Sequence, residues 1–163
     1  MQVPNPHIKS IKDIKSHEIY LEFIEPKNDI NDMQGKPFET LTFNEVSVLK
    51  RVIVKDLQTA LDIFFDGLKL EDCRIIDFYQ WQKYVVDELN VRTKREAQLE
   101  ITDPRLKQAG AERLNIFGEL NTKIALAEQF GTTPQEVGGW NYDFVVNILL
   151  FNKVRAEINL IKQ

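Results

Sequence analysis

Few residues of this chain have the chemistry of an active site. Its two histidines, His7 and His17, are the side chains whose ordinary pKa lies near neutrality, and both lie in the N-terminal stretch. The single cysteine, Cys73, follows Glu71 and Asp72, whose charges raise the pKa of a thiol. The sequence has no phosphate-binding glycine loop, dinucleotide fingerprint or zinc-ligand spacing. We therefore expect a protein with no enzymatic activity, cofactor or metal.

Basic residues concentrate at one place, near the middle of the chain. They could contact the phosphates of a nucleic acid, in which case the contacts would be Arg92, Lys94, Arg95, Arg105 and Lys107. Acidic residues are interleaved with them, and a solvated helix end has the same pattern. The net charge of −4 also disfavours nucleic acid as a partner. A nucleic-acid-associated accessory protein of replication or packaging is thus the alternative hypothesis.

The strongest structural signal is a helix-start pattern that occurs three times. Each copy has an apolar residue, a capping residue, an aromatic residue and a second apolar residue four positions after the cap. The copies are Leu41-Thr42-Phe43-x-Glu45-Val46, Ile76-Asp77-Phe78-x-Gln80-Trp81 and Trp140-Asn141-Tyr142-x-Phe144-Val145. Thr, Asp and Asn accept hydrogen bonds from the N–H groups of a first helical turn, and the flanking apolar residues pack as a staple. We therefore predict helices after Thr42, Asp77 and Asn141.

Apolar spacing predicts how far these helices run. The first should run from 43 to about 65, the second to about 91, and the last nearly to 163. A further helix is expected over 104–130, because a proline opens it and Gly131 follows it. The sequence around Thr133 predicts one short capped turn before the last helix.

The N-terminal part has a different pattern. Residues 17–25 alternate apolar and polar side chains as a strand does, 27–35 is rich in turn residues, and 36–41 could return as a second strand. We predict a mainly α fold, a bundle of about four helices with a small N-terminal β-hairpin. Its expected parts are an arm over 1–16, the hairpin over 17–41 and a single helical domain over 42–163.

Two segments could bind a protein partner. Ile8, Ile11 and Ile14 recur every third residue, which fits either a loosely tethered terminus or a docking arm. The last helix is apolar on more than one side, so it is either sandwiched within the fold or offered to a partner. Its exposed contacts would be Phe151, Val154, Ile158 and Ile161. The partner would be a component of a larger assembly or another copy of this chain.

Composition also predicts where the protein works. The sequence contains no apolar run of the roughly 20 residues that cross a bilayer, and its N-terminus lacks the apolar segment of a signal peptide. One cysteine allows no intramolecular disulfide. We therefore expect a cytoplasmic protein without a membrane partner.

Several stretches resemble phage tail proteins. The segments 19–26, 35–38 and 45–49, which read IYLEFIEP, GKPF and EVSVL, resemble the opening of the T4-type baseplate hub and hub-assembly family. The segments 126–131, 134–137 and 140–142, which read LAEQFG, PQEV and WNY, are similar to the helical ending of tail-assembly chaperones. The resemblance implies a bacteriophage tail or baseplate protein, either structural or a chaperone. It would act in the host cytoplasm or within the virion, and no catalytic residues are carried over.

Overall fold

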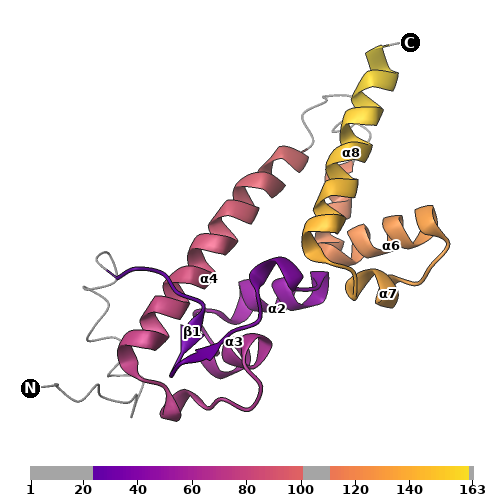
Figure 1. The fold of residues 1–163 in the computed structure, drawn as a ribbon. Helices are drawn as coiled ribbons and strands as arrows, with labels where there is room; N and C mark the ends of the chain where they lie inside the picture. The colour runs from indigo at the N-terminus through magenta and orange to yellow at the C-terminus, as the bar shows by residue number, and fades with distance from the viewer. Residues whose placement is uncertain (1–23, 101–110, 162–163) are drawn as a thin grey trace, which may run out of the picture. The chain divides into compact units, whose positions relative to one another are not determined.

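The fold is mainly α, as predicted. The computed structural model describes residues 24–100 and 111–161 (Figure 1). Within these ranges the strands are β1 (Asp29–Ile30) and β2 (Met33–Gln34). The α-helices are α2 (Phe43–Val52), α3 (Leu57–Phe64), α4 (Ile75–Glu96), α6 (Glu119–Phe130), α7 (Pro134–Gly138) and α8 (Tyr142–Ile161). The 3-10 helices are η2 (Phe38–Thr40), η3 (Leu70–Asp72), η4 (Ala97–Leu99) and η5 (Ala111–Phe117).

The described residues form two compact units. The first unit contains 24–40 and 48–91, and the second contains 41–47, 92–100 and 111–161. The sequence predicted one helical domain over 42–163, whereas the contacts group most of α3 and α4 with the hairpin. The expected arm over 1–16 lies outside the described residues.

The hairpin of the first unit lies within the segment predicted to be its loop. Asp29 pairs with Gln34 and Ile30 with Met33, in antiparallel register. The two residues between the strands have positive φ angles, 52° and 65°, which is the backbone of a type I′ turn. Most of the first predicted strand lies outside the described residues, and 36–41 holds η2 instead of a strand.

The hairpin turn is fixed to the start of α4. The backbone N–H of Asn31 donates to Oδ2 of Asp77 at 2.9 Å, and Asn31 Oδ1 accepts from the backbone N–H of Arg74 at 2.9 Å. The prediction that Asp77 caps this helix was wrong, because α4 already begins at Ile75. The carboxylate suited to a cap is instead used by the hairpin turn.

The helix predicted over 43–65 is interrupted. It is divided into α2 and α3, and Asp56 accepts hydrogen bonds from the backbone N–H of Thr59 at 3.1 Å and from its hydroxyl at 2.6 Å. Three consecutive β-branched residues, 52–54, precede this cap and weaken helix propagation. The side chain of Asp56 satisfies an N–H group in the first turn of α3, which favours ending one helix and starting another at this point.

Trp81 lies at the centre of the first unit's core. Its ring centroid is 5.6 Å from that of Phe64, 6.0 Å from Phe65 and 5.7 Å from Phe78. Such aromatic pairs contribute about 0.5–1.5 kcal/mol each beyond their buried area. The predicted apolar face of α4 is confirmed here, because Trp81 and Val85 are fully buried.

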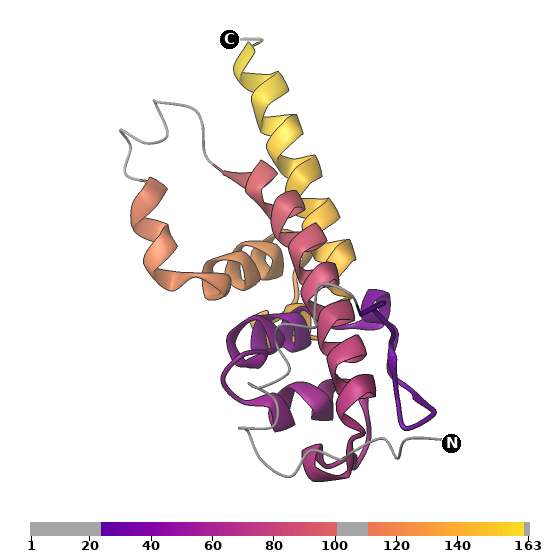
Figure 2. The ribbon, with the colours of Figure 1, turned by 90° about the vertical axis from the view of Figure 1, so that its left-hand side faces the viewer.

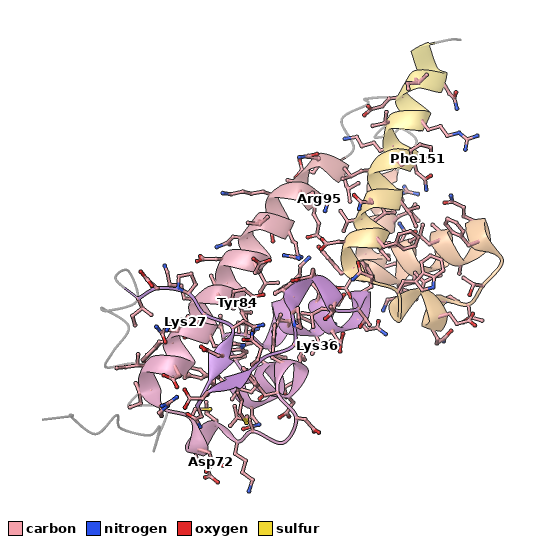
Figure 3. All side chains as sticks on the ribbon, in the orientation of Figure 1. Lys27, Lys36, Asp72, Tyr84, Arg95 and Phe151 are labelled. Atoms are coloured by element: carbon pink, nitrogen blue, oxygen red, sulfur yellow. The ribbon has the colours of Figure 1, made fainter. Side chains whose placement is uncertain are left out.

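Backbone hydrogen bonds hold the extended segments of this unit against its helices. Figure 3 labels Lys27, Lys36 and Tyr84, which take part in these contacts or lie beside them. The N–H of Lys27 donates to the carbonyl of Gln80 at 3.1 Å, and that of Lys36 to the carbonyl of Phe64 at 2.9 Å. The hydroxyl of Tyr84 accepts from the backbone N–H at the start of η2, at 3.3 Å. The chain is thereby tied to both α3 and α4.

The second unit is built on two of the predicted helix starts, which pair with each other. Thr42 and Asn141 form an antiparallel bridge. The N–H that opens α2 donates to the carbonyl of Trp140 at 2.8 Å, and the N–H that opens α8 donates to the carbonyl of Leu41 at 3.0 Å. The two copies of the pattern are thus joined by reciprocal hydrogen bonds.

Both of these helix starts carry their predicted caps. The backbone N–H of Glu45 donates to Thr42 Oγ1 at 3.2 Å, and the backbone N–H of Thr42 donates to Glu45 Oε2 at 2.7 Å. At α8 the N–H of Phe144 donates to Asn141 Oδ1 at 3.0 Å. The first residues of the two helices, Phe43 and Tyr142, stack with ring centroids 6.0 Å apart and planes 16° apart.

The helix predicted over 104–130 is shorter than expected. Residues 101–110 lie outside the described ranges, 111–117 form η5, and α6 begins only after Gly118. Gly118 has φ 48° and ψ −128°, a backbone region that is essentially restricted to glycine. The predicted end is confirmed, because Gly131 caps α6 with φ 65°. The predicted capping box at Thr133 is also confirmed.

Candidate protein-docking surface

Exposed apolar side chains are distributed unequally between the two units. Among the residues that the structure describes, ten exposed large hydrophobic residues belong to the second unit and five to the first. The described buried hydrophobic residues have the opposite distribution, with nine in the second unit and sixteen in the first. A contiguous exposed apolar surface on a folded protein marks an interaction site more often than scattered residues do.

The most regular of these surfaces runs along α8. We define the α8 seam as the exposed residues Phe144, Phe151, Val154 and Ile158, whose exposed fractions are 53, 65, 53 and 48%. Seven residues make almost two full turns, so Phe144, Phe151 and Ile158 lie nearly above one another over about 21 Å. The opposite face of α8 is buried in the second unit through Val145 and Val146.

The sequence predicted three of the four seam residues as partner contacts. Phe151, Val154 and Ile158 are exposed as expected, and their binding of a partner stays a prediction. Ile161 lies within the bounds of α8, but its side chain is outside the described part of the structure. The proposed arm residues Ile8, Ile11 and Ile14 are also outside it. Phe144 was not among the predicted contacts, although its spacing of seven from Phe151 was a usable signal.

The side chains near the end of α8 are exposed over its last described turns. All residues from 154 to 159 are exposed, so every side of the helix is open there. Both ribbon views show this end of α8 extending away from α6 and α7 (Figure 1 and Figure 2). Short helices are marginal in water without packing partners. The exposed apolar residues Val154 and Ile158 are therefore not packed on every side in this part of α8.

A second apolar surface lies on η5 and α6, and sequence reasoning did not identify it as a site. Its exposed residues are Leu114, Ile116, Phe117, Leu120 and Ile124. Phe117, Leu120 and Ile124 have helical spacing with Ala127, which is buried, whereas these three residues are exposed. The spacing can be read from the sequence, but their exposure is a property of the folded chain.

Aromatic rings connect the end of α6 to the start of the α8 seam. The ring centroid of Trp140 lies 5.4 Å from Phe130 and 6.0 Å from Phe144, both in edge-to-face geometry. Phe130 and Phe144 are each about half exposed. The seam thus begins on a rigid aromatic support.

Polar residues anchor the first turns of α8 to the end of α4. The guanidinium of Arg92 is buried and lies 2.9 Å from Oδ2 of Asp143. Arg95 reaches Oδ1 of Asp143 at 3.5 Å and also donates to Oδ1 of Asn147. The interpretation of this basic cluster as a solvated helix end is therefore wrong for Arg92. The cost of burying its charge is offset by a carboxylate at the start of α8.

This anchoring also bears on the nucleic-acid alternative. Two of the five residues of the predicted basic cluster, Arg92 and Arg95, are ion-paired to Asp143. Lys94 is exposed, and Arg105 and Lys107 lie outside the described residues. Within the described part, the predicted basic cluster therefore presents one exposed lysine to a nucleic acid.

Further hydrogen bonds join α8 to the end of α4 and to η4. The hydroxyl of Tyr142 donates to Oε1 of Glu96 at 2.5 Å, and burial together with this carboxylate raises the pKa of the phenol. Lys153 Nζ donates to the carbonyls of Gln98 at 2.6 Å and Glu100 at 2.9 Å. Carbonyls near the end of α4 and η4, which lack helical partners, are satisfied in this way.

The described residues with acid–base, nucleophilic or metal-ligating chemistry can be located individually. Over 24–100 and 111–161 there is no group of three or more His, Cys, Asp or Glu side chains that could hold a metal. Burial, with Asp72 and Asp77 nearby, raises the pKa of the Cys73 thiol to about 12. Both histidines lie outside these ranges. Among the helices that the structure describes, none is long and apolar enough to span a bilayer.

Comparison of the chain with protein-family models, with curated proteins and with solved structures finds no match.

Proposed function

We propose that this chain is a non-enzymatic protein-interaction factor that docks onto a larger assembly through the α8 seam. The observation that carries the proposal is the unequal distribution of apolar residues between the two units. Over 24–100 and 111–159, the first unit buries most of its large hydrophobic side chains, whereas the second leaves more of them exposed than buried. Covering an exposed Phe or Ile side chain contributes about 1.5–3 kcal/mol, which favours a bound partner.

The contacts between the start of α8 and the end of α4 support this proposal, because they hold α8 in one position within the second unit. The ion pairs of Asp143 with Arg92 and Arg95 fix the start of α8 within the second unit, so the apolar residues farther along the helix are presented in a defined orientation. A preorganised surface loses less conformational freedom on binding than a flexible one. In the setting that the sequence resemblance implies, the assembly is a phage tail or baseplate, and the chain is a structural subunit or a chaperone of it.

Site-specific photo-crosslinking tests this function. A photoreactive amino acid is placed at Phe151, which is exposed on the α8 seam, in the protein expressed during particle assembly. We expect adducts with tail or baseplate components, identified by mass spectrometry, or with another copy of this chain. The matched control carries the same group at Val54, which is 81% exposed but belongs to the first unit. Equal adducts at both positions, or none at Phe151, would contradict the proposal.

A further inference from the structure

The segment 111–130 changes from one kind of helix to another at a single residue. η5 keeps the 3-10 conformation for seven residues, whereas such runs seldom exceed three or four. α6 follows after one residue, and the ribbon changes direction sharply between the two helices (Figure 2). That residue is Gly118, with φ 48° and ψ −128°. The bend therefore depends on a backbone conformation that residues with a Cβ rarely adopt.

No buried side chain of η5 holds the bend in place. Every side chain of η5 that the structure describes is exposed, Leu114 and Phe117 among them. Leu120 is exposed as well, and the first buried residue of α6 is Leu126. A Cβ added to Gly118 would meet no atom within 4 Å apart from its chain neighbours. A change of backbone conformation at this glycine that leaves α6 in place therefore uncovers no described core residue of η5.

The sequence on both sides of the bend favours an α-helix. Residues 111–130 contain no proline and no consecutive β-branched residues. A continuous helix would give the N–H groups in the first turn of α6 intrahelical acceptors, whereas Gly118 provides no side-chain cap for them. The opposing term is the glycine itself, which disfavours a helix interior about five-fold relative to alanine. The bent and continuous forms thus differ by small terms of opposite sign.

We propose that residues 111–130 form a two-state element, in which the bend at Gly118 interconverts with one continuous α-helix. The inference goes beyond the proposed function, because it concerns neither α8 nor its partner. In the continuous form, the exposed residues Phe117, Leu120 and Ile124 lie on one side of the same helix, since they are three or four positions apart. In the bent form, Phe117 belongs to a different helix axis from the other two. The element is a conformational device that brings apolar residues on both sides of the glycine into one stripe.

Nuclear magnetic resonance of the Gly118→Ala variant tests the second state. Alanine disfavours the bend and favours a helix interior, so the substitution should shift the equilibrium toward the continuous helix by about 20-fold or more. Nuclear Overhauser effects between an α-proton and the amide proton four residues later should then appear from Ile116 to Leu120 and from Phe117 to Asn121. A folded variant without them would overturn the inference. A variant that fails to fold would do the same, because the continuous helix is the conformation that it should adopt.

Gly131→Ala is the matched control. Gly131 also has a positive φ, 65°, and a Cβ added there meets no atom within 4 Å. Pro134 follows three residues later and prevents one helix from continuing through this position. Alanine at 131 should therefore produce no such effect between residue 131 and Gln135. New helical contacts at both glycines would overturn the inference, because they would reflect the general helix preference of alanine.

Glu119→Pro tests the opposite shift. Residue 119 is the first residue of α6, where proline is well tolerated, whereas in a continuous helix its N–H would donate to the carbonyl of residue 115. Added to Gly118→Ala, this substitution should remove the new Overhauser effects. In the unsubstituted chain, exchange between the two forms should broaden the amide signals of 113–121, and Glu119→Pro alone should sharpen them. Sharp signals in the unsubstituted chain, or broadening that the proline leaves unchanged, would overturn the two-state element.

Discussion

Asp143 supports a buried charge, so its loss should be more costly than its partial exposure suggests. It is the carboxylate that accepts from the buried guanidinium of Arg92 and also contacts Arg95. We expect Asp143→Ala to lower the free energy of unfolding by about 1.5–3 kcal/mol, because Arg92 remains buried without its partner. Chemical denaturation measures this difference.

The control for this prediction is an ion pair at the surface of the same helix. Lys153 and Glu157 lie 3.8 Å apart and Glu157 is half exposed, so Glu157→Ala should cost less than about 0.5 kcal/mol. An Asp143 variant as stable as the Glu157 variant would show that Arg92 regains solvent or another partner.

Glu136 gives the second residue-scale prediction, a dependence of stability on pH. The hydroxyl of Thr132, followed by the backbone N–H and hydroxyl of Thr133, lowers the pKa of Glu136 from its ordinary value of 4.5. A lowered pKa in the folded state means that the contribution is present above pH 4.5 and is lost as the pH falls below it. Glu136→Gln should therefore be less stable than the unsubstituted chain at pH 7.

The same pair of proteins should become more alike in acid, because a protonated Glu136 is neutral like glutamine. Thermal unfolding midpoints measured from pH 7 down to pH 3 check the trend. A difference that stays constant over this range would mean that the charge of Glu136 does not contribute to the cap.

At the scale of the element, the break between η5 and α6 depends on one glycine. Gly118 has φ 48° and ψ −128°, which a residue with a Cβ adopts only with strain. We expect Gly118→Ala to destabilise the chain by about 1–3 kcal/mol. Gly131→Ala replaces a left-handed cap at φ 65° and should cost only about 1 kcal/mol. Denaturant titration would contradict the argument if the two costs were reversed.

How well these elements could be predicted depends on how far apart in the sequence their interacting residues lie. The caps at Thr42, Thr133 and Asn141 involve residues three positions apart, and all three were predicted from the sequence. Asp77 has the same local pattern but bonds Asn31, which is 46 residues away, and its assignment as a cap was wrong. Capping patterns are thus reliable only where no distant residue competes for the side chain.

Other predictions also differ from the structure, each for a physical reason. The sequence around Arg92 is as polar as an exposed helix end, and its burial depends on Asp143, 51 residues later. The hairpin was predicted at the wrong residues because a type I′ turn at Asn31 and Asp32 was not recognised in a polar stretch. At the candidate site, the spacing of Phe151, Val154 and Ile158 was readable, whereas the lack of a covering element is a property of the folded unit.

At the scale of the whole molecule, the two units should respond differently to the same truncation. Val85 is fully buried in the first unit, and Val154 is half exposed on the α8 seam. We expect Val85→Ala to lower the free energy of unfolding by about 1–3 kcal/mol through the cavity it leaves. Val154→Ala should change it by less than about 0.5 kcal/mol when measured on dilute, monomeric protein.

Raising the protein concentration separates packing within one chain from packing between chains. If α8 pairs between copies, the cost of Val154→Ala should increase with concentration, while that of Val85→Ala should not. Denaturation at two concentrations makes the comparison. Equal costs for the two substitutions in dilute protein would mean that Val154 belongs to the core of the second unit.

The reciprocal bonds between Thr42 and Asn141 also determine when the second unit can form. They join segments about 100 residues apart, so their closure carries the entropy cost of a long loop. On a ribosome, the segment 41–47 emerges well before residues 140–145, and during that interval Phe43 has no ring to stack on. The core residues of the first unit, by contrast, are all synthesised by residue 91. The order of synthesis therefore makes the unit that carries the proposed docking surface the last to mature.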